Sequence, residues 1–168
     1  MSNSIRVAGI IKESIVDGTG IRYVVFAQGC PHACKGCHNE AALDFSGGYD
    51  YEIEKILSEI KINTLFSGVT FSGGEPFCQP KAFLELADEL VKKEVNIWVY
   101  TGYTYEELLE LAKKDEDIKN LMERIDVLVD GRFVLEKRDI ALNFKGSANQ
   151  RCIDMKATAE KNEIVLFE

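Results

Sequence analysis

The amino-acid sequence predicts an α/β fold, an incomplete (partial) TIM-type β/α barrel with mainly parallel strands, forming a single domain over residues 1–168. Two observations lead to this fold class. Short segments rich in Ile and Val alternate with segments whose apolar residues recur every three or four positions, the pattern of strands alternating with helices in a mainly parallel sheet. The chain has 168 residues. Because a closed eightfold barrel takes about 250 residues, we expect an incomplete one.

The predicted elements follow one another along the chain with few interruptions. Strands are expected over 5–11, 21–27, 69–71, 96–101 and 126–129, with a possible last strand over 163–167. Helices are expected over 50–61, 83–91, 104–112 and 115–124. The third of these begins at a capping box formed by Thr104 and Glu107. Residues 28–49 have no sustained period and are expected to form a long loop. Because loops at the carboxyl ends of parallel strands share one rim, the segments that follow the strands should converge there.

Composition and charge exclude several classes of partner. The net charge is −8, from 28 acidic and 20 basic residues, so we expect neither nucleic acid nor an anionic membrane as a partner. No apolar run approaches the roughly 18 residues that span a bilayer, and the first residues lack the apolar stretch of a secretory signal. We therefore expect a cytoplasmic protein. In that reducing compartment, its five cysteines are expected to bind metal or act in catalysis rather than form disulfides.

Three cysteines lie within eight residues of the predicted loop, at Cys30, Cys34 and Cys37. Thiolates are soft ligands that suit iron–sulfur clusters, zinc or copper(I). The number of cysteines is informative, because a four-iron cluster held by three thiolates leaves one iron open to a substrate or cofactor, whereas electron carriers use four. The cysteine loop therefore predicts an iron–sulfur cluster with an open iron.

Two other sites fit the same cysteines. With His32 or His38 as a fourth ligand they would form a structural zinc site. Cys34 and Cys37 alone have the spacing of a redox dithiol. The cysteine loop by itself leaves these alternatives open.

A second segment, Gly73-Gly74-Glu75-Pro76, directly follows a predicted strand. Paired glycines allow the backbone to approach a ligand closely and direct bare N–H and C=O groups at it. A tight turn before a helix would use the same residues, so this segment alone does not decide between the two interpretations.

Together and in this order, the two segments resemble the radical S-adenosylmethionine superfamily, whose signature is Cys-x3-Cys-x2-Cys after the first barrel strand and Gly-Gly-Glu-Pro after the second. The resemblance implies that the three cysteines hold one [4Fe-4S] cluster and that S-adenosyl-L-methionine chelates the open iron. It also implies that Gly73, Gly74 and Glu75 line the cofactor pocket. No catalytic residue is expected beyond the cluster and the cofactor site.

Three more residues are candidates for binding the cofactor. Asn39 closes the Cys-His-Asn sequence after the cysteines, and Thr101 and Asp130 lie at strand ends on the predicted rim. Asp130 could contact the cofactor or a bound cation, although aspartate before glycine is also ordinary turn chemistry.

Other segments narrow the resemblance to activating proteins of glycyl-radical enzymes. The residues 17–22 and Cys-His-Asn are similar to that group, and 98–103, 128–133 and 145–150 are similar to the activating protein of anaerobic ribonucleoside-triphosphate reductase. The resemblance implies that an external one-electron donor such as flavodoxin reduces the cluster, and that the reductase receives a glycyl radical. A formate-lyase-type activase is the alternative within the group, and a non-catalytic zinc-binding interaction module is the alternative from another class.

One position departs from the superfamily pattern. Many members have an aromatic residue before the third cysteine that packs on the adenine, and this chain has Gly36 there. The ribonucleotide-reductase subgroup also tends to glycine at this place. The resemblance therefore leaves the group that stacks on the adenine unassigned. Cys78 and Cys152 are expected to be buried cysteines without a catalytic role.

Overall fold

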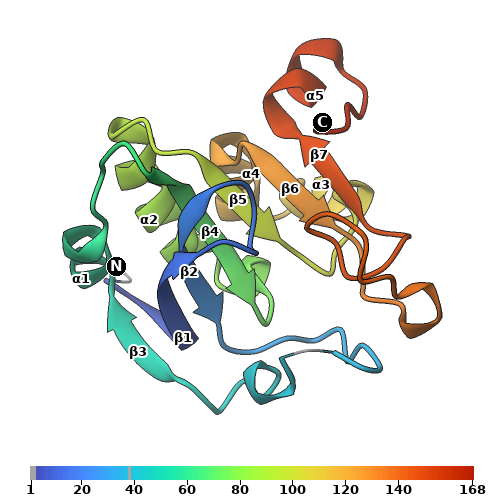
Figure 1. Cartoon of the computed structure of the whole chain (residues 1–168), viewed down its shortest axis with the longest axis horizontal. Coiled ribbons are helices and arrows are strands. Elements are labelled where there is room, and N and C mark those ends of the chain that lie inside the picture. The colour runs from blue at the N-terminus through green and yellow to red at the C-terminus, as the bar shows by residue number, and fades with distance from the viewer. Residues whose placement is uncertain (1–2, 38) are drawn as a thin grey trace.

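The computed structural model describes residues 3–37 and 39–168, so His38 lies outside the described residues. Its seven strands form one sheet in the order β3-β1-β2-β4-β5-β6-β7 (Figure 1). The central strands β2, β4, β5 and β6 run parallel, whereas β1, β3 and β7 pair antiparallel with their neighbours. The bounds are β1 (Ser4–Ser14), β2 (Ile21–Ala27), β3 (Tyr49–Glu52), β4 (Phe66–Gly73), β5 (Ile97–Tyr100), β6 (Val127–Asp130) and β7 (Arg151–Asp154). The prediction of a mixed α/β fold with mainly parallel central strands is confirmed.

Four of the five α-helices pack against one face of this sheet, and the fifth extends beyond the end of β7 (Figure 1). The helices are α1 (Ile53–Glu59), α2 (Pro80–Lys92), α3 (Tyr105–Ala112), α4 (Glu116–Arg124) and α5 (Met155–Lys161), with short 3-10 turns η1 (Glu40–Ala42), η2 (Pro76–Cys78) and η3 (Leu135–Lys137). Each of the five α-helices contributes buried apolar side chains to the same large core. The capping box predicted at Thr104 and Glu107 is present at the start of α3. In Figure 1, α2 and α4 lie behind the strands.

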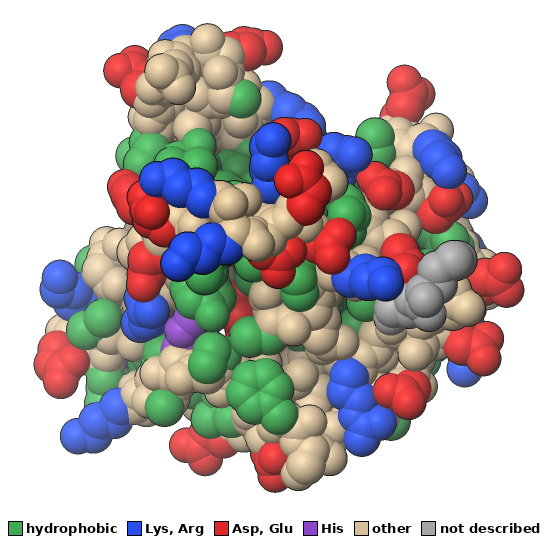
Figure 2. All heavy atoms as spheres, turned by 180° about the vertical axis from the view of Figure 1, so that it is seen from behind, with side chains coloured by type: hydrophobic (Ala, Val, Ile, Leu, Met, Phe, Trp, Pro, Cys, Tyr) green, Lys and Arg blue, Asp and Glu red, His purple; other side chains and the backbone are tan. Residues whose placement is uncertain are grey.

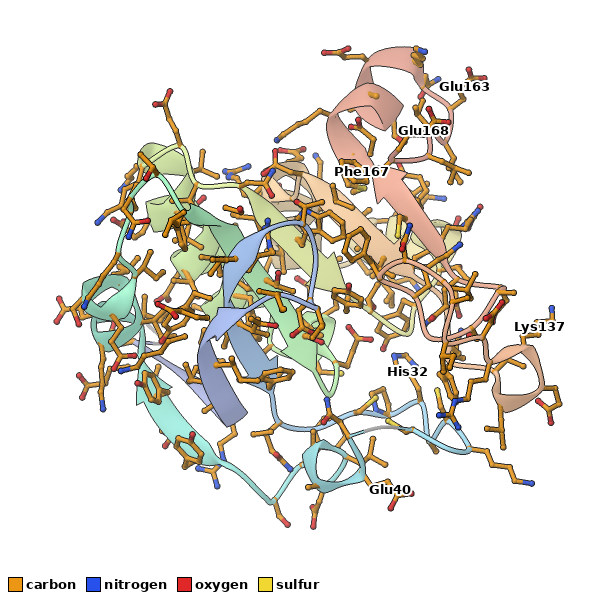
Figure 3. All side chains as sticks on the ribbon, in the orientation of Figure 1. His32, Glu40, Lys137, Glu163, Phe167 and Glu168 are labelled. Carbon is orange, nitrogen blue, oxygen red and sulfur yellow. The ribbon has the colours of Figure 1, made fainter. Side chains whose placement is uncertain are left out.

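The strands place alternate residues on the two faces of the sheet. In β5, Ile97 and Val99 belong to the helix-covered core, whereas Trp98 belongs to a smaller cluster on the opposite face. The Trp98 ring meets the Phe144 and Phe167 rings edge-on, at centroid distances of 5.1 and 5.2 Å. Phe167 reaches this face from the C-terminal segment (Figure 3). The face opposite the helices is therefore covered by irregular segments.

Arg22 lies fully buried on this second face. Its guanidinium donates hydrogen bonds to Thr70 Oγ1 at 2.8 Å, to the Val69 carbonyl at 3.0 Å and to Asn96 Oδ1 at 2.9 Å. It also lies over the Trp98 ring, 5.5 Å from the centroid. Burial lowers the pKa of Arg22 to about 10, so the group keeps its charge at neutral pH. The segment 17–22 thus contains a structural arginine that ties β2 to β4 and to the residue before β5.

Two edge strands differ from the sequence prediction. Residues 163–167 do not form a strand, because Leu166 makes only a single bridge to Ile153, and the last strand is β7 instead. β3 occupies residues expected to end the loop and begin a helix. Both edge strands are short and mostly polar. β3 is defined by its pairing with β1, and β7 by its pairing with β6. Neither has a buried apolar run that the sequence could display.

Over the described residues, the sheet has two free edges and does not close on itself. In the order of the described strands, β3 and β7 are the two edges and are not paired with each other, so the sheet is open. Figure 2 shows acidic and basic side chains interspersed over the face seen from behind. Within residues 3–37 and 39–168, no helix is both long enough and apolar enough to cross a membrane.

Candidate functional site

The loops that follow β2, β4, β5 and β6 meet around a cavity of about 270 Å³. Among the sequence-predicted site residues, those on its wall are Cys30, Cys34, Cys37, Asn39, Gly73, Gly74 and Thr101. The convergence of these loops on one rim, expected from the strand order, is confirmed. The chemical roles of the residues remain predictions.

The cysteine loop is fastened to the protein at its start. The Gly29 N–H donates to the Ala42 carbonyl at 2.7 Å, and the Cys30 N–H donates to the Leu43 carbonyl at 3.1 Å. The three thiols are all half-buried. Burial raises the pKa of the Cys30 thiol, a hydrogen bond from the His32 backbone opposes the shift, and the nearby carboxylate of Glu75 adds to it.

The paired glycines let the end of β4 approach the cysteine loop. The Gly74 N–H donates to the Ala27 carbonyl at 2.8 Å, and the Glu75 N–H donates to the Gly29 carbonyl at 2.8 Å. A Cβ on Gly74 would lie 2.4 Å from the Gly29 carbonyl oxygen, and a Cβ on Gly73 would lie 2.4 Å from the Ala27 nitrogen. The sequence indicated close approach to a ligand. In the structure, both glycines are required because their backbone packs closely against the backbone of Ala27 and Gly29.

The Glu75 carboxylate is buried beneath the cavity rather than on its wall. It accepts hydrogen bonds from Thr101 Oγ1 at 2.8 Å, from the Gly102 N–H at 2.8 Å and from the Phe77 N–H at 3.1 Å. His32 Nε2 lies 2.6 Å from the same carboxylate. Glu75 therefore binds groups from three different loops, a role that spacing along the sequence could not show.

His32 points from the cysteine loop toward the ends of the strands (Figure 3). Its ring packs edge-on against Tyr103, with centroids 4.5 Å apart. A Cβ on Gly102 would lie only 2.3 Å from His32 Cδ2, so this position requires glycine. The sequence offered His32 as a candidate fourth ligand of a zinc site, and in the structure its Nε2 lies against Glu75.

Asp130 lies away from the cavity wall. Its carboxylate is buried and accepts hydrogen bonds from the Tyr105 N–H at 2.8 Å and from Arg151 Nε at 3.1 Å. These contacts hold the start of α3 and the start of β7 together at the end of β6. Its binding to the cofactor or to a cation stays a prediction, made for a carboxylate that already has these partners within the protein.

Tyr100 was not singled out from the sequence. Its ring borders the cavity, and its hydroxyl is buried without a hydrogen-bond partner among the described residues. Burial raises the pKa of this hydroxyl, and the charge of Asp17 adds to the shift, so it stays protonated as a donor. A buried donor without a partner is uncommon in proteins. The only signal in the sequence is a polar aromatic residue at a strand end.

Comparisons with known proteins assign the family. Residues 16–153 match the family model described as "4Fe-4S single cluster domain". The anaerobic ribonucleoside-triphosphate reductase-activating protein of Vibrio cholerae is 39% identical over 145 residues, which cover 81% of this chain and 89% of that protein. The protein of the same name from Escherichia coli is 33% identical over 147 residues, covering 81% and 90%. This chain belongs to that family.

Other comparisons agree with the family or are too weak to add to it. The activating protein of Haemophilus influenzae is 37% identical over 145 residues, covering 81% of this chain and 89% of that protein. Among solved structures, QueE from Escherichia coli matches 60% of this chain and 54% of its own, with a TM-score of 0.47 and 21% identity.

The residues of this family member fit the cluster that the family model names. Three soft thiol donors border one cavity, and Tyr100, whose buried hydroxyl has no partner among the described residues, lines the same cavity. Within the described part of the chain, no three His, Cys, Asp or Glu side chains lie close enough to hold a metal ion. The three cysteines are included in this finding, so their fit to a cluster is one of donor chemistry. Cys78 and Cys152 are half-buried and not on the cavity wall.

Proposed function

We propose that this protein is a radical S-adenosylmethionine activase that generates a glycyl radical on anaerobic ribonucleoside-triphosphate reductase. The observation that carries the proposal is the cavity itself, which is bordered by the three thiols and by the Gly73-Gly74 turn in a member of the activating-protein family. When bound, one reduced [4Fe-4S] cluster and S-adenosyl-L-methionine supply a reductive cleavage of the S–C5′ bond and a 5′-deoxyadenosyl radical that removes a glycine Cα hydrogen.

The chain's own residues bind and orient these groups. Cys30, Cys34 and Cys37 supply thiolates to the cluster, leaving one iron for the cofactor. Gly73 and Gly74 present main-chain groups at the cavity wall for the amino-acid part of the cofactor.

Polar side chains complete the cofactor site. Asn39, Tyr100 and Thr101 line the cavity, and the Asn39 side chain supplies a further hydrogen bond to the cofactor. Glu75 keeps Thr101 in place from below, and Asp130 fixes the neighbouring rim through Arg151.

The open sheet suits a protein substrate. We propose that it is an incomplete β/α barrel, forming a single radical S-adenosylmethionine domain over residues 1–168. Four of its five α-helices lie on one face, and Trp98 and Tyr100, which borders the cavity, lie on the other. Since the sheet does not close, a glycine-bearing loop of the reductase can approach the cavity from the open side. The electron comes from an external one-electron donor such as flavodoxin.

The first test is anaerobic incubation of the cluster-loaded protein with S-adenosyl-L-methionine and dithionite. We expect 5′-deoxyadenosine and methionine in equal amounts. If neither is released, the radical mechanism is wrong.

The second test identifies the partner. The reduced protein is mixed separately with the host's anaerobic reductase and with its formate-lyase, and electron paramagnetic resonance is recorded. We expect a doublet, split by the remaining glycine α-hydrogen, with the reductase. A doublet with the formate-lyase alone would assign the protein to the alternative activase class.

A further inference from the structure

Two sequence segments that distinguish this chain, 128–133 and 145–150, bind each other in the structure. Asn149 Nδ2 donates to the Arg132 carbonyl at 2.8 Å, and Gln150 Nε2 donates to the Gly131 carbonyl at 2.9 Å. The Val134 N–H donates to the buried Ser147 hydroxyl at 3.2 Å. The backbone on both sides of residue 133 is therefore held by side chains of the second segment.

The side-chain amide of Gln150 also orders its own segment, residues 145–150. Gln150 Oε1 accepts hydrogen bonds from the Gly146 N–H at 2.8 Å and from the Ser147 N–H at 3.1 Å. One glutamine thus uses both ends of its amide, one for each segment. The hydrogen bonds between the two segments therefore fix the backbone on both sides of Phe133.

Phe133 lines the cavity, and its ring lies close to two glycines, Gly146 and Gly36. A Cβ on Gly146 would lie 3.1 Å from Phe133 Cδ1, and a Cβ on Gly36 would lie 3.4 Å from Phe133 Cε2. Gly36 lies in the cysteine loop, between Cys34 and Cys37. The missing side chain at Gly146 therefore leaves room for this ring, and Gly36 places the ring beside the cysteine loop at ordinary contact distance.

The charge of the cavity restricts the ligand that can meet this ring. The described residues on its wall include no lysine or arginine, and Asp17 is the only Asp or Glu among them. A nucleotide phosphate would find no cation there, whereas a positively charged sulfonium with an uncharged nucleoside is compatible. The aromatic side chains Phe26, Tyr100 and Phe133 on the wall suit the flat base of such a ligand.

We propose that Phe133 stacks on the adenine of S-adenosyl-L-methionine and is the aromatic binding residue of this site. The inference rests on the proposed function. In this arrangement the cysteines bind the cluster and the Gly73-Gly74 turn binds the amino-acid part of the cofactor. Phe133 contacts the adenine base. The segments 128–133 and 145–150 then serve to hold that ring in place.

The test measures binding of three probes to the anaerobic, cluster-loaded protein by equilibrium dialysis: S-adenosyl-L-methionine, 5′-deoxyadenosine and L-methionine. Because removing an aromatic partner from a stacked base weakens binding, Phe133→Ala should raise Kd for the two adenosine-containing probes at least about fivefold. Kd for L-methionine and the iron content per chain should remain at wild-type values. Phe133→Trp should restore binding of both adenosine-containing probes.

Leu135→Ala is the matched control, because Leu135 also packs near Gly36 but does not border the cavity. It should bind all three probes as the wild type does. Equal Kd values for wild type and Phe133→Ala would overturn the inference. So would a loss of iron, or an equal weakening of all three probes, since Phe133 would then only shape the loop. If the wild-type protein itself binds no S-adenosyl-L-methionine, the proposed function fails first and this inference falls with it.

Discussion

His32 Nε2 lies 2.6 Å from Glu75 Oε1, inside the protein, and joins the cysteine loop after β2 to the turn after β4. Both side chains are almost inaccessible, at 4% and 0% exposure. Thr101, which directly follows β5, donates to the same carboxylate. One acidic side chain therefore ties together the ends of three adjacent parallel strands, beneath the cavity.

Replacing this carboxylate tests its importance for the site. Glu75→Gln keeps the shape of the side chain but brings an NH₂ group to face existing donors. Hydrogen bonds to a charged group contribute roughly 1.5–3 kcal/mol each, so we expect the free energy of unfolding to fall by about 2–3 kcal/mol. Urea denaturation of the cluster-free protein measures this change, and iron analysis after reconstitution should show reduced uptake. Glu54→Gln, at an exposed position of α1, is the control and should change neither value. Unchanged stability of Glu75→Gln would contradict this role.

The ligand assignment is tested by removing each cysteine in turn. Cys30→Ala, Cys34→Ala and Cys37→Ala should each abolish the cluster, because two thiolates do not hold a four-iron cluster firmly. Cys78→Ala and Cys152→Ala should keep iron and sulfide near wild-type content. The measurements are iron and sulfide per chain and the absorbance near ~400 nm after anaerobic reconstitution. Loss of the cluster in Cys78→Ala, with retention in Cys30→Ala, would show that the assignment is wrong.

A side chain at Gly74 should damage the protein scaffold as well as cofactor binding. Its Cβ would lie 2.4 Å from the Gly29 carbonyl oxygen and 2.8 Å from the Ala42 carbonyl oxygen. Overpacking of this kind costs about 1–3 kcal/mol, so Gly74→Ala should lower the free energy of unfolding by that amount and reduce iron uptake. Gly9→Ala is the matched control, since its Cβ meets nothing within 4 Å. Wild-type stability and iron content in Gly74→Ala, with weakened cofactor binding alone, would argue for a purely ligand-facing role.

Cys78 should react slowly with alkylating reagents. Burial, with a further contribution from Glu75, raises the pKa of its thiol to about 11. Because the thiolate is the reactive form, alkylation by iodoacetamide at pH 8 should be at least roughly tenfold slower than for the same cysteine in the denatured chain. The rate should rise as the pH approaches 11, since a raised pKa moves formation of the thiolate to higher pH. Mass spectrometry of the peptide that contains Cys78 follows the reaction. Equal rates in the folded and denatured chains would contradict the burial that raises this pKa.

The sequence predicted those elements whose residues carry a buried apolar pattern. β2 begins and ends where the alternation of Ile, Val and Phe places it, and α3 begins at its capping box. β3 and β7 were missed because they are short and mostly polar, and pairing with β1 and β6 decides their conformation. Local pattern therefore identified the central strands, and tertiary pairing determined the edges.

The site was predicted in part, for a related reason. Motif spacing identified the cysteines and the Gly73-Gly74 turn, which lie on one cavity wall. It could not show that Glu75 points beneath the cavity, or that the Tyr100 hydroxyl lacks a partner, because these facts depend on which side chains lie opposite one another. The positions of Gly36 and Phe133, about a hundred residues apart in sequence, likewise become related only after folding.

The fastening of the cysteine loop affects how the cluster is acquired. Each residue that is fixed in one backbone conformation loses about 1–2 kcal/mol of conformational entropy. Main-chain hydrogen bonds from Gly29 and Cys30 and the contact of His32 with Glu75 fix this part of the loop when the polypeptide folds. When the cluster binds, fewer loop residues remain to be ordered. Less of the binding free energy is therefore offset by lost conformational entropy, and the cluster is held more tightly. A preorganised loop of this kind should let the folded, metal-free chain accept a cluster with little change in its circular dichroism.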